Sequence, residues 1–107
     1  MGEDKLLGAL ELLALRVLER GAAHGFAIAE RVRTISEEAL RVEEGSLYPA
    51  LHRMEEAGLI RAEWALSENR RRARFYRLTA RGRQRLARER ERWTRTAAAV
   101  ARVLERA

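Results

Sequence analysis

The sequence has no cysteine, two histidines and a single proline among its 107 residues. The absence of cysteine excludes disulfide bonds, thiolate zinc sites and cysteine nucleophiles. His24 and His52 fall on different predicted elements without a spaced carboxylate partner, and the chain has no glycine-rich phosphate loop. We therefore expect a protein that is not an enzyme and that has no metal or other cofactor.

The sequence also lacks an apolar run long enough to cross a membrane. Its most apolar stretch, residues 6–18, is interrupted by Glu11 and Arg16 and falls short of the ~20 apolar residues that a membrane span needs. Glu3 and Asp4 precede it, where a signal peptide would carry basic residues. We therefore expect a cytoplasmic protein without membrane contact.

Charged residues are abundant, and the two signs are unevenly distributed. The chain has 22 Lys+Arg and 16 Asp+Glu, a net charge of +6, and Lys5 is its one lysine. Residues 1–60 carry 7 basic and 11 acidic side chains, whereas residues 61–95 carry 13 basic and 4 acidic ones. A basic excess favours a polyanionic partner, most often nucleic acid. Its concentration in one segment indicates selective contact rather than general affinity for polyanions.

Apolar spacing predicts a mainly α protein with one small β-hairpin. The predicted helices cover residues 5–20, 25–35, 45–57 and about 80–105, and a short extended piece covers 40–42. Alternating residues predict strands at 59–66 and 73–79, joined by the polar turn 67–72. Gly21 and Gly58 are typical stops after a helix, and Thr79 is a good cap for the last one. Pro49 is expected in about the first turn of the third helix, where its missing N–H costs little.

The spacing also predicts which side chains form the core. The buried stripe of the second helix should be Ile28, Ala29, Val32 and Ile35, and that of the third Leu47, Leu51 and Met54. One face of the first helix should be formed by Leu6, Leu7, Leu10, Leu13, Ala14, Val17 and Leu18. Leu12 and Leu15 lie on the opposite side with Gly8. Two apolar faces indicate that this helix packs in its own domain and against another chain.

Three short helices followed by an arginine-rich hairpin predict a winged helix-turn-helix. In that fold the third helix enters the DNA major groove and the hairpin contacts the backbone or minor groove. The outward residues of the third helix are Ser46, Tyr48, Pro49, His52, Arg53 and Glu56, and the hairpin carries Arg70, Arg71, Arg72, Arg74 and Arg77. Surface residues without a role and a solvated charge run are the alternative interpretations. Glu43, Glu44, Glu55 and Glu56 should penalise poorly docked DNA.

The most specific motif in the chain is Gly-Ser-Leu-Tyr-Pro-Ala-Leu at residues 45–51, within the run 43–55. Further runs are His-Gly-Phe-Ala-Ile at 24–28, Gly-Leu-Ile at 58–60 and Arg-Ala-Arg-Phe-Tyr-Arg-Leu-Thr at 72–79, followed by Gly82. Together they closely resemble the PadR family of bacterial transcriptional regulators. The resemblance covers roughly residues 5–95 and fits the small subfamily with one C-terminal helix.

The resemblance implies a homodimeric repressor that binds a pseudo-palindromic operator in double-stranded DNA and is often released by a small-molecule effector. It implies that Ser46, Tyr48 and Pro49 face DNA and that Arg71, Arg72 and Arg74 form the wing. The start of the second helix, at His24, Gly25 and Phe26, would contact phosphate. The composition leaves open a winged-helix module that binds nucleic acid or protein without operator specificity.

The last predicted helix carries its own signal for a second chain. Leu86, Arg90, Trp93, Ala97, Val100 and Leu104 recur at alternating spacings of four and three, as in a coiled-coil seam, although Arg90 interrupts it. We expect one compact unit, with a DNA-binding part at residues 1–79 and a dimerisation helix at 80–107. The predicted dimer interface comprises Leu6, Leu10, Leu12, Leu13, Leu15, Leu86, Trp93, Ala97, Val100 and Leu104. The small subfamily also implies that Trp93 and Ala97 contact a planar hydrophobic effector.

Overall fold

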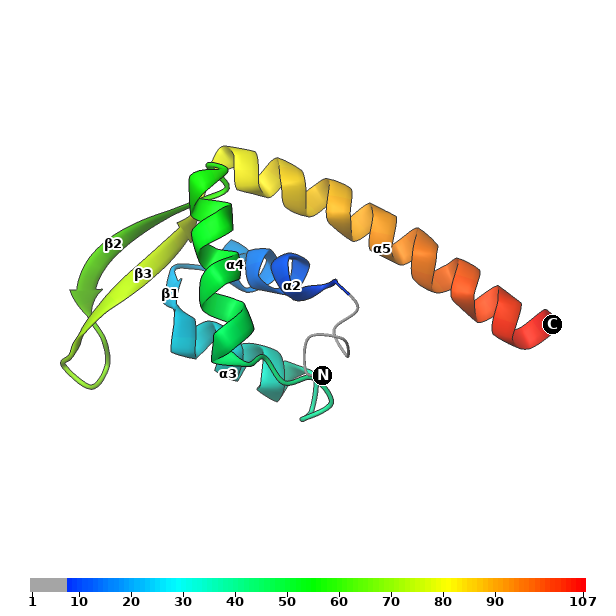
Figure 1. Cartoon of the computed structure of the whole chain (residues 1–107), viewed down its shortest axis with the longest axis horizontal. Coiled ribbons are helices and arrows are strands. Elements are labelled where there is room, and N and C mark those ends of the chain that lie inside the picture. Colours follow the sequence, from blue (N-terminus) through cyan, green and yellow to red (C-terminus); the bar gives the residue numbers. More distant parts are fainter. Residues whose placement is uncertain (1–7) are drawn as a thin grey trace.

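The computed structural model describes residues 8–107 of the chain. The elements follow in the order α2 (Leu10–Glu19), β1 (Ala23–His24), α3 (Gly25–Ile35), α4 (Glu44–Glu56), β2 (Ile60–Leu66), β3 (Arg72–Leu78) and α5 (Ala80–Arg106). Figure 1 shows α2, α3, α4 and a twisted hairpin in one body, from which α5 extends as a long rod. The predicted mainly α, winged helix-turn-helix fold is confirmed.

The three short helices enclose one apolar core that the base of the hairpin closes. Ile28 of α3, Leu47 and Leu51 of α4 and Ile60 of β2 are fully buried in it. Met54 joins them, so the predicted inward face of α4 is confirmed. Burial of this face turns the opposite face of α4 toward solvent, where Tyr48, Pro49 and His52 are exposed.

Helix α4 ends in a Schellman motif built around Gly58. The Gly58 amide donates to the Glu55 carbonyl at 3.0 Å and the Leu59 amide donates to the Met54 carbonyl at 2.9 Å. Gly58 has φ +79°, a left-handed conformation that favours glycine. The helix starts at Glu44, so Pro49 lies in its second turn rather than its first, and the Gly45 carbonyl has no amide donor at that position.

The sheet contains a strand that the sequence pattern does not predict. Its order is β1-β3-β2, all antiparallel, and β1 pairs Ala23 with Tyr76 and His24 with Phe75. Two residues are too few to produce an alternating pattern. The segment 40–42, in contrast, was expected to be extended but forms no strand.

One face of the hairpin is buried in the core at its base and exposed toward its tip. Ile60 lies opposite Leu78 and Ala62 opposite Tyr76 at the base of the hairpin. Further along the same face, Trp64 lies opposite Arg74, and both side chains are exposed. Alternation along the strands therefore places wing arginines on the face that leads back to α4.

The end of the hairpin and the start of α5 are joined to the end of α4. The Thr79 amide donates to the Leu59 carbonyl at 3.1 Å, and the Thr79 hydroxyl lies 2.7 Å from the Gly58 carbonyl oxygen. That hydroxyl oxygen also accepts from the Gly82 amide at 3.0 Å, which confirms Thr79 as the N-cap of α5. Gly82 packs so closely that a Cβ there would overlap the Leu59 carbonyl oxygen.

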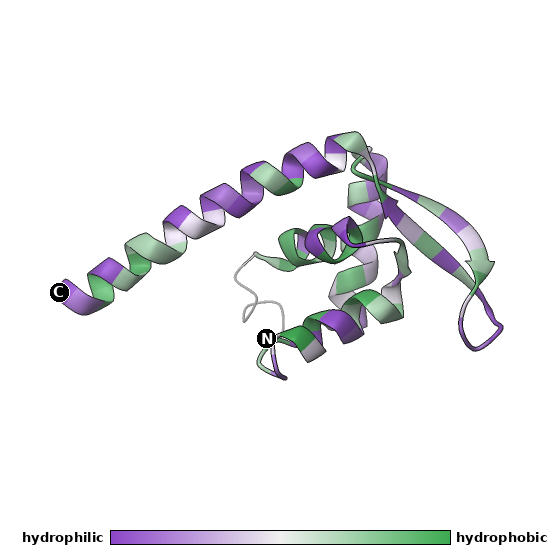
Figure 2. Ribbon diagram, turned by 180° about the vertical axis from the view of Figure 1, so that it is seen from behind, coloured by the Kyte–Doolittle hydropathy of each residue, from purple (hydrophilic) through white to green (hydrophobic). Residues whose placement is uncertain are grey.

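Most of α5 makes few contacts within the chain. Gly82 and Leu86 are its buried residues, and both lie in the first two turns. Beyond them, Trp93, Val100, Val103 and Leu104 are exposed, the last at 80%. Figure 2 shows hydrophobic residues in the outer half of α5, away from the body of the protein.

Three expectations about burial are corrected. Leu15 and Leu86, assigned to a dimer interface, are only 1% and 2% exposed within the chain and therefore leave little surface for a partner. Leu15 is buried because the side of α2 opposite its main apolar face also joins the core. Ile35, expected in the core, is 69% exposed because α3 ends there. Leu6 and Leu7 lie outside the described residues.

No helix within residues 8–107 combines the length and the apolar character that a membrane span requires.

Candidate nucleic-acid interface

A groove of about 330 Å³ brings together three segments that the sequence singles out. The start of α3 contributes His24, Gly25 and Phe26 to its lining, and α4 contributes Tyr48. The wing, which we define as β2, β3 and the turn 67–71, contributes Arg71, Arg72 and Arg74, among others. Seven of the twelve residues predicted to contact DNA therefore lie around one depression.

Tyr48 packs directly on the first residue of α3. A Cβ at Gly25 would lie 2.7 Å from Cε1 of the Tyr48 ring and 2.8 Å from its hydroxyl oxygen. Only glycine leaves room for the ring at this place. Gly25 thus fixes where the ring of Tyr48 sits between the two helices of the helix-turn-helix.

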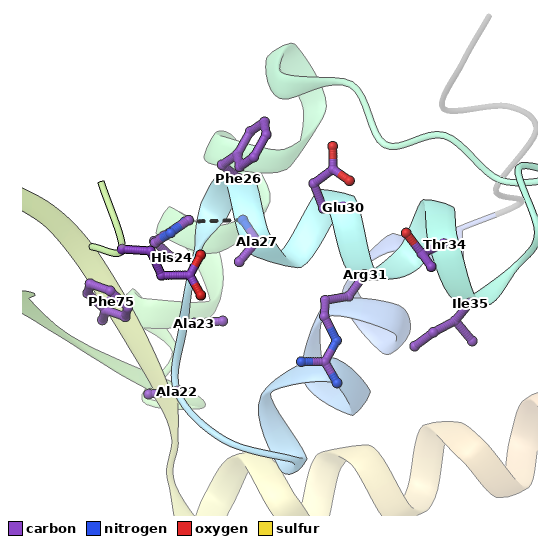
Figure 3. Close-up of a pocket in the computed structure, with 11 residues that line it drawn as sticks. Ala22, Ala23, His24, Phe26, Ala27, Glu30, Arg31, Thr34, Ile35 and Phe75 are labelled. Carbon is purple, nitrogen blue, oxygen red and sulfur yellow. Dashed lines mark hydrogen bonds between the residues drawn. The ribbon is translucent and has the colours of Figure 1, made fainter. Parts of the chain in front are cut away.

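His24 caps α3 and also connects that helix to the wing. Its Nδ1 accepts a hydrogen bond from the Ala27 amide at 3.1 Å, drawn as a dashed line in Figure 3. The imidazole stands edge-on to Phe75 of β3, with ring centroids 5.1 Å apart. The sequence pattern does not predict this cap, because histidine is not among the usual N-cap residues. Because Nδ1 is used in the cap, the Nε2 side of the ring is the part left for a phosphate.

A second hollow, of about 480 Å³, lies beside the same cap. Figure 3 shows Phe26, Glu30 and Arg31 projecting from α3 around it, with Phe75 on the far side of His24. Phe26 is exposed and borders both hollows. The start of α3 thus presents an aromatic side chain to solvent next to the groove.

The outward residues of α4 divide into two groups. Ser46, Pro49 and His52 are at least partly exposed on its solvent face, and the His52 imidazole lies 3.3 Å from the Glu56 carboxylate one turn later. Arg53 turns toward α2 instead, where its guanidinium lies 3.4 Å from the Glu11 carboxylate. Short polar side chains near the start of such a helix suit base edges and neighbouring phosphates.

The turn of the wing holds arginine in a conformation that disfavours it. Arg70 has φ +62°, in the left-handed region that turns usually fill with glycine or asparagine. Arg70 and Arg71 are exposed, and neither takes part in an ion pair within the described residues. Turn geometry does not account for arginine here, which favours a role for its charge.

Arg72 and Arg74 share one face of the wing but differ in their partners. The Arg72 guanidinium lies over the Trp64 ring, 4.9 Å from its centroid, which holds the cation without neutralising it. Arg74 lies 2.6 Å from the Glu55 carboxylate of α4. Arg77 points to the opposite face and lies 3.5 Å from Glu63. Sequence reasoning missed the Glu55–Arg74 pair.

Tyr76 of β3 lines the groove next to Tyr48 and Arg74. It is buried, and burial raises the pKa of its phenol, with Glu55 and Tyr48 adding to the rise and Arg74 opposing it. The side chain therefore stays neutral well above neutral pH. Its position next to Tyr48, Glu55 and Arg74 makes it the shared floor of α4 and the wing.

No group of three or more His, Cys, Asp or Glu side chains in residues 8–107 is arranged to hold a metal ion.

Comparisons with known proteins match the part of the chain that contains this groove. The model of the transcriptional regulator PadR-like family matches residues 14–88. A search of curated protein sequences found no match.

Solved structures resemble almost the whole chain. A transcriptional regulator from Clostridium thermocellum has 26% identity and a TM-score of 0.83, over 92% of this chain and 96% of that one. A PadR family transcription regulator from Clostridium difficile has 29% identity and a TM-score of 0.77, over 91% and 99%. A PadR-like transcriptional regulator from Bacillus cereus has 25% identity and a TM-score of 0.80, over 94% and 96%.

The contact between Gly25 and Tyr48 predicts that Gly25→Ala weakens DNA binding by displacing the ring. We expect a loss of about tenfold or more, within the range of one good base contact, in fluorescence-anisotropy titrations with a duplex that the protein prefers. Thermal unfolding serves as the control for folding, since alanine is a better helix former than glycine. In a Tyr48→Ala background the same change should have little further effect. Equal losses in both backgrounds would show that Gly25 acts independently of Tyr48.

Proposed function

Because this chain belongs to the PadR-like family of DNA-binding transcriptional regulators, we propose that it acts as a homodimeric repressor of a pseudo-palindromic operator, released by a small-molecule effector. The observation that carries the proposal is the groove where the start of α3, Tyr48 and the wing arginines meet. A helix-turn-helix and an adjacent basic wing form the arrangement that reads a major groove and holds the flanking backbone.

In the proposed complex α4 lies in the major groove with its exposed face toward the bases. Ser46, Tyr48, Pro49 and His52 are placed to contact base edges or adjacent phosphates, because the opposite face of the helix is buried in the core. The start of α3 and the arginines of the wing contact the backbone on the two sides of α4. Phosphate contacts set the position of the protein and base contacts set the sequence preference.

This division of roles predicts different effects for Arg72→Ala and Tyr48→Ala. Arg72→Ala should weaken binding to all duplexes similarly. It should also reduce the slope of the logarithm of the binding constant against the logarithm of salt concentration by about one. Tyr48→Ala should reduce the preference for the operator over scrambled DNA, which we expect to be roughly 10³-fold or more in the unmodified protein. Titrations on an operator obtained by selection from random duplexes, and on a scrambled version, measure both quantities.

Two outcomes would contradict the proposal. Equal losses on both duplexes for both variants would remove the division between α4 and the wing. An unmodified protein that binds both duplexes alike, with only the electrostatic salt dependence, would indicate a winged-helix module without operator specificity.

The proposed dimer is supported by the apolar surface that one chain leaves open. Trp93, Ala97, Val100 and Leu104 are exposed and recur along one side of α5. Figure 1 shows that this part of the helix lies away from the rest of the chain. Soluble monomers rarely expose an apolar stripe of this kind. Leu10, Leu12 and Leu13 of α2 are only partly buried, and we propose that they supply the contacts on the body.

Adjacent alanines on α5 provide a matched test of the dimer. Ala97 lies on the apolar side, whereas Ala98 is turned about 100° further around the helix. Both are exposed within the chain, so replacement of either by glutamate costs the monomer little. We expect Ala97→Glu to shift the mass measured by light scattering to that of one chain and Ala98→Glu to leave a dimer. A single-chain mass for the unmodified protein at micromolar concentration would refute the dimer.

The proposed effector is a planar hydrophobic compound bound between the α5 helices of the dimer. Trp93 is 40% exposed and is followed one turn later by Ala97, whose small side chain leaves space beside the indole. In a Trp64→Phe background, fluorescence of Trp93 should be quenched or shifted on titration with planar aromatic compounds, and operator affinity should fall in parallel. Unchanged fluorescence over the soluble range of such compounds would argue against this site.

A further inference from the structure

One ion pair joins α4 to the wing at an arginine that lines the groove. Arg74 Nη2 lies 2.6 Å from Glu55 Oε2, a length typical of a charge-assisted hydrogen bond. The Glu55 and Arg74 side chains are 28% and 44% exposed. Among the described residues it is the shortest ion pair that joins two different helices or strands.

The pair sits where DNA is proposed to dock. Arg74 lines the same groove as Tyr48, and Glu55 follows Tyr48 by seven residues, two helical turns along the same side of α4. Arg72, two residues away on the same face of β3, has no carboxylate partner within the described residues. Two neighbouring wing arginines therefore differ in charge compensation, because Glu55 neutralises Arg74 whereas Arg72 lies over the uncharged Trp64 ring.

A phosphate that approaches Arg74 must compete with this carboxylate. To bind the phosphate, the guanidinium leaves Glu55 or shares itself between two anions, and the Glu55 charge then lies close to the phosphate. Both effects oppose binding, and like charges brought together disfavour the wrong partner. A duplex held by phosphate attraction alone has no other contact to offset this cost, whereas a duplex that also makes base contacts with α4 does.

We propose that Glu55 is a specificity-determining residue, which holds Arg74 back from the phosphates of non-cognate DNA. Its carboxylate lowers affinity for random duplexes more than affinity for the operator. This inference rests on the proposed placement of DNA along α4 and the wing.

Replacement of Glu55 by glutamine tests the inference with little change in shape. Glu55→Gln should raise affinity for a scrambled duplex several-fold and raise operator affinity less, so that the preference for the operator falls. Arg74 then becomes free to neutralise one more phosphate. On scrambled DNA, the slope of the logarithm of the binding constant against the logarithm of salt concentration should steepen by about 0.9 per protomer. Affinities measured by fluorescence anisotropy at several salt concentrations give both results.

Glu56→Gln is the matched control. It removes the same charge from the adjacent residue, but within the described residues Glu56 pairs with His52 of its own helix and with no arginine of the wing. We expect it to leave the salt dependence unchanged. Arg74→Ala, made alone and together with Glu55→Gln, tests whether the gain passes through Arg74. It should cost little on scrambled DNA when Glu55 is present and abolish the gain when Glu55 is replaced, a non-additive result.

Three results would overturn the inference. Equal gains from Glu55→Gln and Glu56→Gln would show a general charge effect. Additive effects of Glu55→Gln and Arg74→Ala would show that Glu55 does not act through Arg74. Loss of operator affinity in Glu55→Gln, with scrambled DNA unaffected, would show that Glu55 only holds the wing in place. The scrambled-duplex measurements stand even if the unmodified protein has no operator preference, so this failure is distinct from failure of the proposed function.

Discussion

The packing of Gly82 and Thr79 against Leu59 is the constraint on which the other features depend. The end of α4, the base of the wing and the first turn of α5 meet there, within hydrogen-bonding distance of the Gly58 and Leu59 carbonyls. Gly82 lies too close to the Leu59 carbonyl oxygen for any residue with a Cβ. The three elements with proposed roles in reading DNA and in pairing with a second chain are therefore joined at one closely packed junction.

Basic and acidic side chains are separated between the wing and α4. The basic residues concentrate on the wing and the start of α5, whereas α4 carries Glu44, Glu55 and Glu56. In the proposed complex, phosphate attraction therefore arises beside α4 and not on it. A duplex in that complex gains the full attraction only when it also fits the side chains of α4. Neutralisation of Arg74 by Glu55 sharpens this arrangement at one position.

The sequence predicts the parts of this fold that local rules control. The bounds of α3, α4 and α5, the Gly58 stop and the Thr79 cap each follow from a few neighbouring residues. The first helix, predicted from residue 5, begins only at Leu10, because Gly8 has a left-handed φ of +75° and Ala9 is the N-cap. The sequence pattern fails where the outcome depends on distant packing. Leu15 lies opposite the main apolar face of α2, yet other elements bury it. Ile35 follows the spacing of the buried residues of α3, but it is the last residue of that helix and is exposed. The groove residues were predicted individually, whereas their pairing across 19 positions, as in Glu55 and Arg74, required the register of the hairpin.

In the proposed dimer, α5 decides which operators fit. Two recognition helices must be spaced by about one turn of DNA, roughly 34 Å, and the junction at Leu59 fixes each α4 to its own α5. A helix of 27 residues is about 40 Å long, so a small change in how two such helices cross moves their bodies by several ångströms. The effector proposed beside Trp93 would act between these two helices and would need no contact with α4. In this proposal the close packing at Gly82 and Leu59 passes the change in crossing angle to α4 and the wing, and the spacing of the two recognition helices changes at the DNA.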